Sequence, residues 1–163
     1  MKHTLSVLVT NKPGVLARIS GLLSRRLYNI ESIAAGYTEE PGITRITLVV
    51  QGDDYTLAQV MKQLSKLVDV IKIVELKYDE SVARELALLK VYVSCERRSD
   101  IINLVTVFRA NIIDVSKDTM IIEILGDESK INAFWAALED YGVAEMVRTG
   151  KIALSRGSVT VKD

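Results

Sequence analysis

The turn at residues 11–16 places residues with ligand-binding potential between a strand and a helix. It reads Asn11-Lys12-Pro13-Gly14-Val15-Leu16. Pro13 has the backbone angle of a helix start and no N–H group to leave unpaired. Gly14 lacks a side chain, so a ligand can approach the backbone amides. These amides and the positive end of the helix dipole suit a carboxylate. Asn11 can cap the helix or bond a ligand's polar groups. The turn is a candidate site for a small anion, with a capped helix and no ligand as the alternative.

The elements that position this turn follow from apolar spacing. Apolar residues at every second position from Leu5 to Val9 predict a half-buried strand, and the stripe from Val15 to Leu27 predicts an amphipathic helix. Strands are also predicted over residues 30–38 and over 43–51, which is rich in β-branched residues, followed by an amphipathic helix over 57–67 and a strand over 70–77. This order, strand-helix-strand-strand-helix-strand, is typical of a ferredoxin-like module.

The second half of the chain repeats this order. We expect strands over residues 86–94, 111–116, 120–125 and 143–148, with helices over 101–108 and 131–138. A local repeat supports it, because Leu27-Tyr28-Asn29-Ile30 and Arg109-Ala110-Asn111-Ile112 both join a helix to a strand. The fold class is therefore α+β, with tandem ferredoxin-like modules over residues 4–78 and 84–160.

The predicted sheet order leaves the second strand of the first module at an edge. In this topology the strands lie in the order fourth, first, third, second. The segment from Glu31 to Tyr37 would then be an exposed edge with little charge, and such edges tend to pair. We expect two copies to dimerise side by side through it.

Composition excludes several classes of protein. The 163 residues include 21 basic and 21 acidic side chains, so the net charge is zero, and a polyanionic partner such as nucleic acid is not expected. The chain has no stretch long enough to span a membrane and no signal-peptide core. Its single cysteine, Cys95, fits a reducing compartment. We therefore expect a cytoplasmic protein.

The chain resembles a known family. The pattern Asn-x-Pro-Gly-Val-Leu-x-Arg-Ile at residues 11–19, followed by Arg-Leu-Tyr-Asn-Ile-Glu-Ser-Ile at 26–33, is similar to that of ACT domains. Further segments at residues 44–47, 63–70, 112–115 and 154–157 resemble the small regulatory subunit of acetolactate (acetohydroxyacid) synthase. The resemblance covers nearly the whole chain, and the first module is the ACT domain.

The resemblance implies a non-catalytic subunit with no cofactor of its own. Such a subunit binds and activates a catalytic large subunit, in which thiamine diphosphate, Mg and FAD are expected. It also confers feedback inhibition by valine or another branched-chain amino acid, in the biosynthesis of isoleucine, valine and leucine. The effector would lie between two ACT modules, contacting the first turn of one chain and the second strand of the other.

The effector-binding residues carried onto this sequence belong to two segments. The turn contributes Asn11, Gly14, Val15 and Leu16, and the facing strand contributes Asn29 and Ile30. We expect no equivalent site in the second module, because residues 94–100 contain no glycine and carry Glu96 and Asp100, which would repel a carboxylate. That module is expected to dock on the large subunit or to transmit the signal.

Other functions are less consistent with the residues. An RNA-recognition module needs aromatic residues on its third strand, and residues 42–50 have none. An enzyme is not supported: His3, the only histidine, is expected to be solvated and Cys95 to be a small buried residue, and no metal or nucleophile motif occurs. The alternative that composition leaves open is a freestanding tandem-ACT sensor of amino acids that regulates transcription or another enzyme.

Overall fold

The chain forms two units and passes between them twice. In this computed structural model, which describes residues 1–162, the first unit contains residues 1–83 and 151–162, and the second contains Arg84–Gly150. The expected boundary of 84–160 for the second module therefore differs at the C-terminus. Residues 151–162 return to the first unit, where a short strand, β9 (Ile152–Ser155), pairs with β5 (Ser81–Tyr92).

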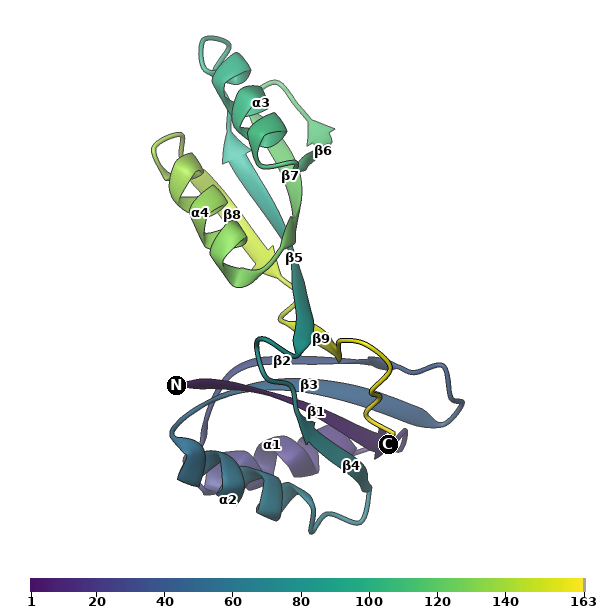
Figure 1. Cartoon of the computed structure of the whole chain (residues 1–163). Helices are drawn as coiled ribbons and strands as arrows, with labels where there is room; N and C mark the ends of the chain where they lie inside the picture. The colour runs from purple at the N-terminus through teal and green to yellow at the C-terminus, as the bar shows by residue number, and fades with distance from the viewer. Residues whose placement is uncertain (163) are drawn as a thin grey trace. The chain divides into compact units, whose positions relative to one another are not determined.

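The first unit has the predicted order of elements. It contains β1 (Lys2–Thr10), α1 (Val15–Arg25), β2 (Asn29–Tyr37), β3 (Ile43–Gln51), α2 (Asp54–Leu64) and β4 (Val70–Glu75). The strands are antiparallel in the order β2-β3-β1-β4, which confirms β2 as an edge. Helices α1 and α2 lie on one face of this sheet (Figure 1).

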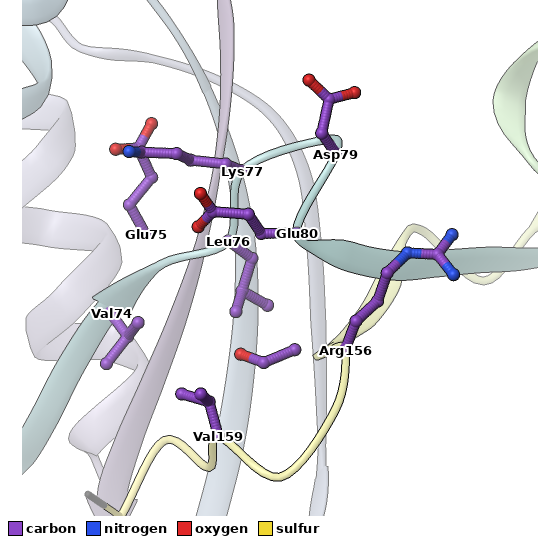
Figure 2. Close-up of a pocket in the computed structure, with 9 residues that line it drawn as sticks. Val74, Glu75, Leu76, Lys77, Asp79, Glu80, Arg156 and Val159 are labelled. Atoms are coloured by element: carbon purple, nitrogen blue, oxygen red, sulfur yellow. The ribbon is translucent and has the colours of Figure 1, made fainter.

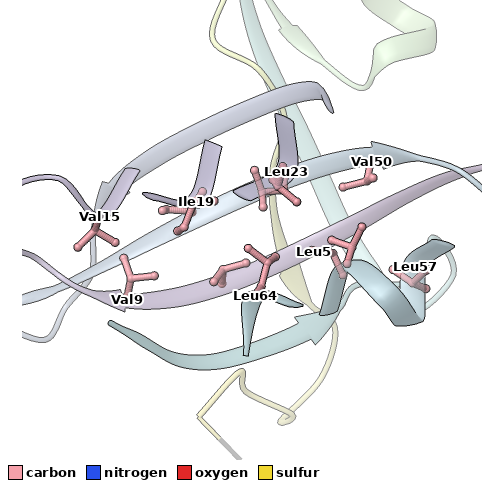
Figure 3. Packing of buried hydrophobic residues seen from close by; sticks show 12 residues of the cluster. Leu5, Val9, Val15, Ile19, Leu23, Val50, Leu57 and Leu64 are labelled. Atoms are coloured by element: carbon pink, nitrogen blue, oxygen red, sulfur yellow. The ribbon is translucent and has the colours of Figure 1, made fainter. Parts of the chain in front are cut away.

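One face of the sheet and one stripe of each helix form the core of this unit. The α1 stripe is Val15, Ile19 and Leu23, at the four-residue spacing that keeps side chains on one helix face. They pack on β1 and β3 through side chains such as Leu5 and Val50 (Figure 3). Helix α2 begins where the carboxylate of its N-cap, Asp53, accepts a hydrogen bond from the amide of Thr56.

The opposite, helix-free face of this sheet is also buried. Because side chains alternate along a strand, Ser6 and Leu8 point away from the helices, as do their partners on β3, Thr47 and Arg45. Ser6, Leu8 and Thr47 are all buried. The C-terminal segment lies on this side of the sheet (Figure 1).

The second unit repeats the plan. It contains most of β5, α3 (Arg98–Val107), β6 (Asn111–Val115), β7 (Thr119–Gly126), α4 (Glu128–Glu139) and β8 (Val143–Arg148), with strand order β6-β7-β5-β8. Its core includes Phe108 and Phe134, whose ring centroids lie 5.1 Å apart. The fold is therefore α+β with two ferredoxin-like units.

The repeat extends to details of the backbone. Leu27 and Arg109, the residues that open the two similar tetrapeptides, both adopt left-handed backbone angles, with φ of 57° and 52°. The next strand starts in each case with an asparagine whose amide donates to a side chain on the neighbouring strand: Asn29 to Gln51, Asn111 to Glu123. The pairing of β2 with β3 and that of β6 with β7 then shift register at the same place.

Candidate functional site: the turn before helix α1

The turn before α1 leaves the helix without a side-chain cap. Gly14, not Asn11, is the N-cap residue, and no side chain bonds the first amides of the helix. The backbone N–H of Asn11 donates to the carbonyl of Gly42 at 2.7 Å, and the Asn11 side chain is exposed. The expectation that Asn11 can cap the helix is therefore wrong, because the helix begins four residues later, at Val15. The uncapped start, with no acidic residue in its first turn, suits an anion.

Two features favour glycine at position 14. Its φ is 83°, in the left-handed region that residues with a Cβ rarely adopt. A Cβ on Gly14 would also lie 3.3 Å from Nη1 of Arg18, closer than an ordinary van der Waals contact. The turn thus combines an exposed backbone with a nearby guanidinium.

Arg18 holds this turn against the loop that precedes β4. Its Nε and Nη2 donate to Oδ2 of Asp69 at 3.0 and 2.6 Å. Thr10, the last residue of β1, donates from its hydroxyl to Oδ1 of Asp69 at 3.2 Å. The hydrogen bonds from Arg18 lower the pKa of the Asp69 carboxyl. Arg18 and Asp69 lie in two of the segments that resemble the family, residues 11–19 and 63–70, but neither was predicted to have a role in the site.

The two remaining predicted turn residues, Val15 and Leu16, differ in the exposure of their side chains. Val15 is buried in the core of the first unit, so only its backbone faces the turn. Leu16 is 46% exposed and is the apolar side chain of this segment that a ligand could contact.

Asn29 and Ile30 lie at the other end of the same sheet. Asn29 pairs with Gln51, which pairs with Lys2, the first residue of β1. The turn follows Thr10, the last residue of β1. A strand of nine residues spans about 26 Å at about 3.3 Å per step. One chain therefore does not bring the two predicted halves of the site together.

The corresponding turn of the second unit is different. Arg97 is the N-cap of α3 and has an ordinary φ of −97°. Its guanidinium lies 5.6 Å from the centre of the Tyr141 ring and donates to the carbonyl of Asp140. The expectation that this unit lacks an amino-acid site stays a prediction.

The structure corrects two expectations about isolated residues. His3 is buried, and its Nδ1 lies 2.9 Å from a carboxylate oxygen of Glu75. Its position on β1, beside β4, explains this burial. Cys95 is exposed, because it lies in the loop between β5 and α3.

A cavity of about 330 Å³ is lined by the end of β4, the segment that follows it and the C-terminal segment. Val74, Leu76 and Val159 give it apolar walls, and Glu80 and Arg156 are among its polar residues (Figure 2). It contains none of the predicted site residues.

Within residues 1–162, no helix is long and apolar enough to cross a membrane. In the same range, no three His, Cys, Asp or Glu side chains group together as a metal site would require.

The first unit, a ferredoxin-like module with an uncapped Pro-Gly turn before its first helix, has the arrangement expected of an ACT domain. Comparison with known families agrees. Residues 5–72 match a family model described as the AHAS small subunit-like ACT domain, and residues 84–157 match one described as the small subunit of acetolactate synthase.

Individual relatives extend this match along the chain. A probable acetolactate synthase small subunit from Archaeoglobus fulgidus is 51% identical, over 97% of this chain and 99% of the relative. An acetolactate synthase small subunit from Mycolicibacterium smegmatis is 50% identical, over 95% of this chain and 91% of the relative. A crystal structure of the acetolactate synthase small subunit from Thermotoga maritima matches with a TM-score of 0.92 and 43% identity, covering 98% of this chain and 99% of that one. The chain belongs to the family of acetolactate synthase small subunits.

Proposed function

We propose that this chain activates the catalytic large subunit of acetolactate synthase and makes it sensitive to valine or another branched-chain amino acid. Membership of the small-subunit family supports a catalytic large subunit as the partner. The observation that carries the proposal is the start of α1 at the exposed Gly14, where no side chain caps the helix. A free amino acid offers the carboxylate that such a helix start binds.

Two copies would complete the site through their β2 edges. In the proposed dimer, β2 of one copy pairs antiparallel with β2 of the second copy, around a two-fold axis near Ile33, the middle residue of the strand. Asn29 of the second copy would then face Tyr37, which pairs with Thr44 in the register of β2 and β3. In the register of β1 and β3, Ile43, the residue that precedes Thr44, pairs with Thr10. The start of one β2 would therefore reach the end of the sheet where the other copy has its Pro-Gly turn.

The chemistry of such a site matches an aliphatic amino acid. The first-turn amides of α1 would receive the carboxylate, and the Asn11 and Asn29 amides would bond the polar groups. Leu16 and Ile30 supply apolar contacts for the side chain. One methylene changes binding by about 1–3 kcal/mol, so leucine and isoleucine are also candidate effectors. A coupling of about 1–3 kcal/mol corresponds to a change of about 5- to 150-fold in affinity.

Thiamine diphosphate, Mg and FAD would all belong to the catalytic partner under this proposal. The small subunit would shift the conformational equilibrium of that partner, and effector binding to the small subunit would alter the shift.

Reconstitution tests the proposal directly. The isolated catalytic large subunit is assayed for acetolactate production alone, with this chain, and with this chain and valine. We expect the chain to raise the activity and valine to lower it again. Binding of valine to the chain with no effect on the large subunit would contradict the proposal and favour a freestanding sensor.

A further inference from the structure

The C-terminal segment forms a strap across the first unit, which we define as residues 151–162. It starts with β9 and ends beyond Val161, which is only 2% exposed. Ala153, within β9, is also buried. A terminal segment that buries apolar side chains on another part of its own unit is a packed element and not a free tail.

The strap lies on the helix-free face of the sheet, and the second unit shows what that face is like without one. In the first unit, Val49 pairs with Thr4 on this face and is 2% exposed. In the second unit, Leu125 pairs with Leu86 on the corresponding face and is 55% exposed. We attribute the burial on the first face to the strap and the chain that leads into β5.

Polar contacts fix the strap at three places. The amide of Lys151 donates to the hydroxyl of Ser32, on β2, at 3.0 Å. The backbone amide of Arg156 donates to the carbonyl of Glu80, just before β5, at 2.8 Å, and its Nε donates to the carbonyl of Ser81, within β5. Lys162 pairs with Glu39 at 2.9 Å and with Glu40 at 3.0 Å.

Two of these three attachments involve β2 or its turn. Ser32 lies within β2, and Glu39 and Glu40 form the turn between β2 and β3. The strap therefore holds the strand that supplies Asn29 and Ile30 to the proposed effector site and forms the proposed dimer edge. Only Thr149 and Gly150 separate the strap from β8 of the second unit, so the two are covalently coupled.

We propose that the strap is a regulatory element that holds β2 in the arrangement required for pairing and effector binding. Release of the strap frees β2, and effector binding favours the docked strap by the same factor, as linkage requires. The part of this inference that concerns the effector rests on the proposed function. The part that concerns the strap and β2 stands on the contacts above.

Hydrogen exchange on the full-length chain tests the inference with a matched pair of variants. Val161→Asp puts a carboxylate at a buried position, whereas Val159→Asp makes the same change in the same segment at a side chain that is 64% exposed. We expect V161D to speed amide exchange about tenfold or more in the strap and in residues 29–40, with α2 unchanged. V159D should match the original chain.

Lys162→Gln provides a second, milder variant, since it removes only the ion pairs with Glu39 and Glu40. It should speed exchange in the same two segments by a smaller factor. Unchanged exchange at residues 29–40 in both V161D and K162Q would overturn the inference, and so would a uniform increase throughout the first unit.

Valine separates this inference from the proposed function. Calorimetry should show weaker valine binding to V161D than to V159D, and valine should slow strap exchange in the original chain. Local loosening of β2 with unchanged valine affinity would overturn the regulatory link. If the original chain binds no branched-chain amino acid, the proposed function fails, and the exchange data alone decide whether the strap holds β2.

Discussion

Arg18 and Asp69 are 51 residues apart in the sequence, and the Arg18 guanidinium donates two hydrogen bonds to the Asp69 carboxylate at the base of the candidate site. Arg18 lies one helical turn after Gly14, and Asp69 lies immediately before β4. The pair therefore joins the start of α1 to the end of the sheet. Thr10 bonds the same carboxylate, which fixes β1 in the same cluster. These contacts keep the uncapped helix start in place before any ligand arrives, so binding requires less ordering.

The charge on Asp69 should make the stability of the first unit depend on pH. The pKa of this carboxyl is lowered below its ordinary value of 3.8, chiefly by the hydrogen bonds from Arg18. A lowered folded-state pKa stabilises the fold above the unfolded value and loses that contribution as the pH falls through the folded value. Asp69→Asn should therefore lower the urea midpoint of unfolding at about pH 7. The variant should also lose less stability than the original chain when the pH is lowered. The exposed carboxylate of Asp114 offers a control, because Asp114→Asn should leave both unchanged.

A negative charge at position 14 should prevent effector binding. Gly14→Asp and Gly14→Asn form a matched pair, because both residue types tolerate the left-handed angle and both require Arg18 to move slightly. Repulsion between two carboxylates about 4 Å apart is about 1–4 kcal/mol. Calorimetry should show valine affinity at least about fivefold weaker for G14D than for G14N. Equal affinities in the two variants would place the effector elsewhere.

An acidic residue in the middle of β2 should dissociate the proposed dimer. Ile33 is 38% exposed on this edge, and near a two-fold axis Ile33→Asp would bring two like charges together. Ile71 is an exposed isoleucine on the opposite edge strand, β4, so Ile71→Asp is the control. Sedimentation at micromolar concentration should detect monomers for I33D and dimers for I71D. Monomers of the unchanged chain would exclude the edge-to-edge dimer.

Replacing Ser6 should stabilise the first unit. Its hydroxyl is fully buried and has no hydrogen-bond partner among the described residues. An unsatisfied buried polar group costs about 1–3 kcal/mol, and removing it recovers part of that cost. Ser6→Ala should raise the free energy of unfolding by about 1 kcal/mol in urea titrations. Ser65→Ala, at an exposed helix end, should change little, and a loss of stability in S6A would contradict the interpretation.

The order of elements could be read from the sequence because it depends on local patterns. The alternation of Leu5, Val7 and Val9 in β1 and the four-residue spacing in α1 each place apolar side chains on one face, and both elements formed as expected. The break at Pro13 and Gly14 also located the turn. The predicted start of α1 at Val15 is also confirmed, and Asn11 is not the cap because Lys12, Pro13 and Gly14 separate it from the helix, with Gly14 at the N-cap position.

Two features of the site region could not be read in this way. The pairing of Arg18 with Asp69 depends on the crossing of chain segments, which no local pattern reports. The strap was missed because β9 has only four residues and its partner, β5, begins about 70 residues earlier. An isolated strand of that length carries too little periodicity to distinguish it from a loop.

The matching left-handed residues, Leu27 and Arg109, and the matching register shifts that follow them show that one backbone geometry joins helix to strand in both units. The first turns of the two units differ, with Pro13 and Gly14 in one and Arg97 and Arg98 in the other. The joint that maintains the module is therefore separate from the turn proposed to bind a ligand, so the side chains of that turn can differ while the fold stays the same.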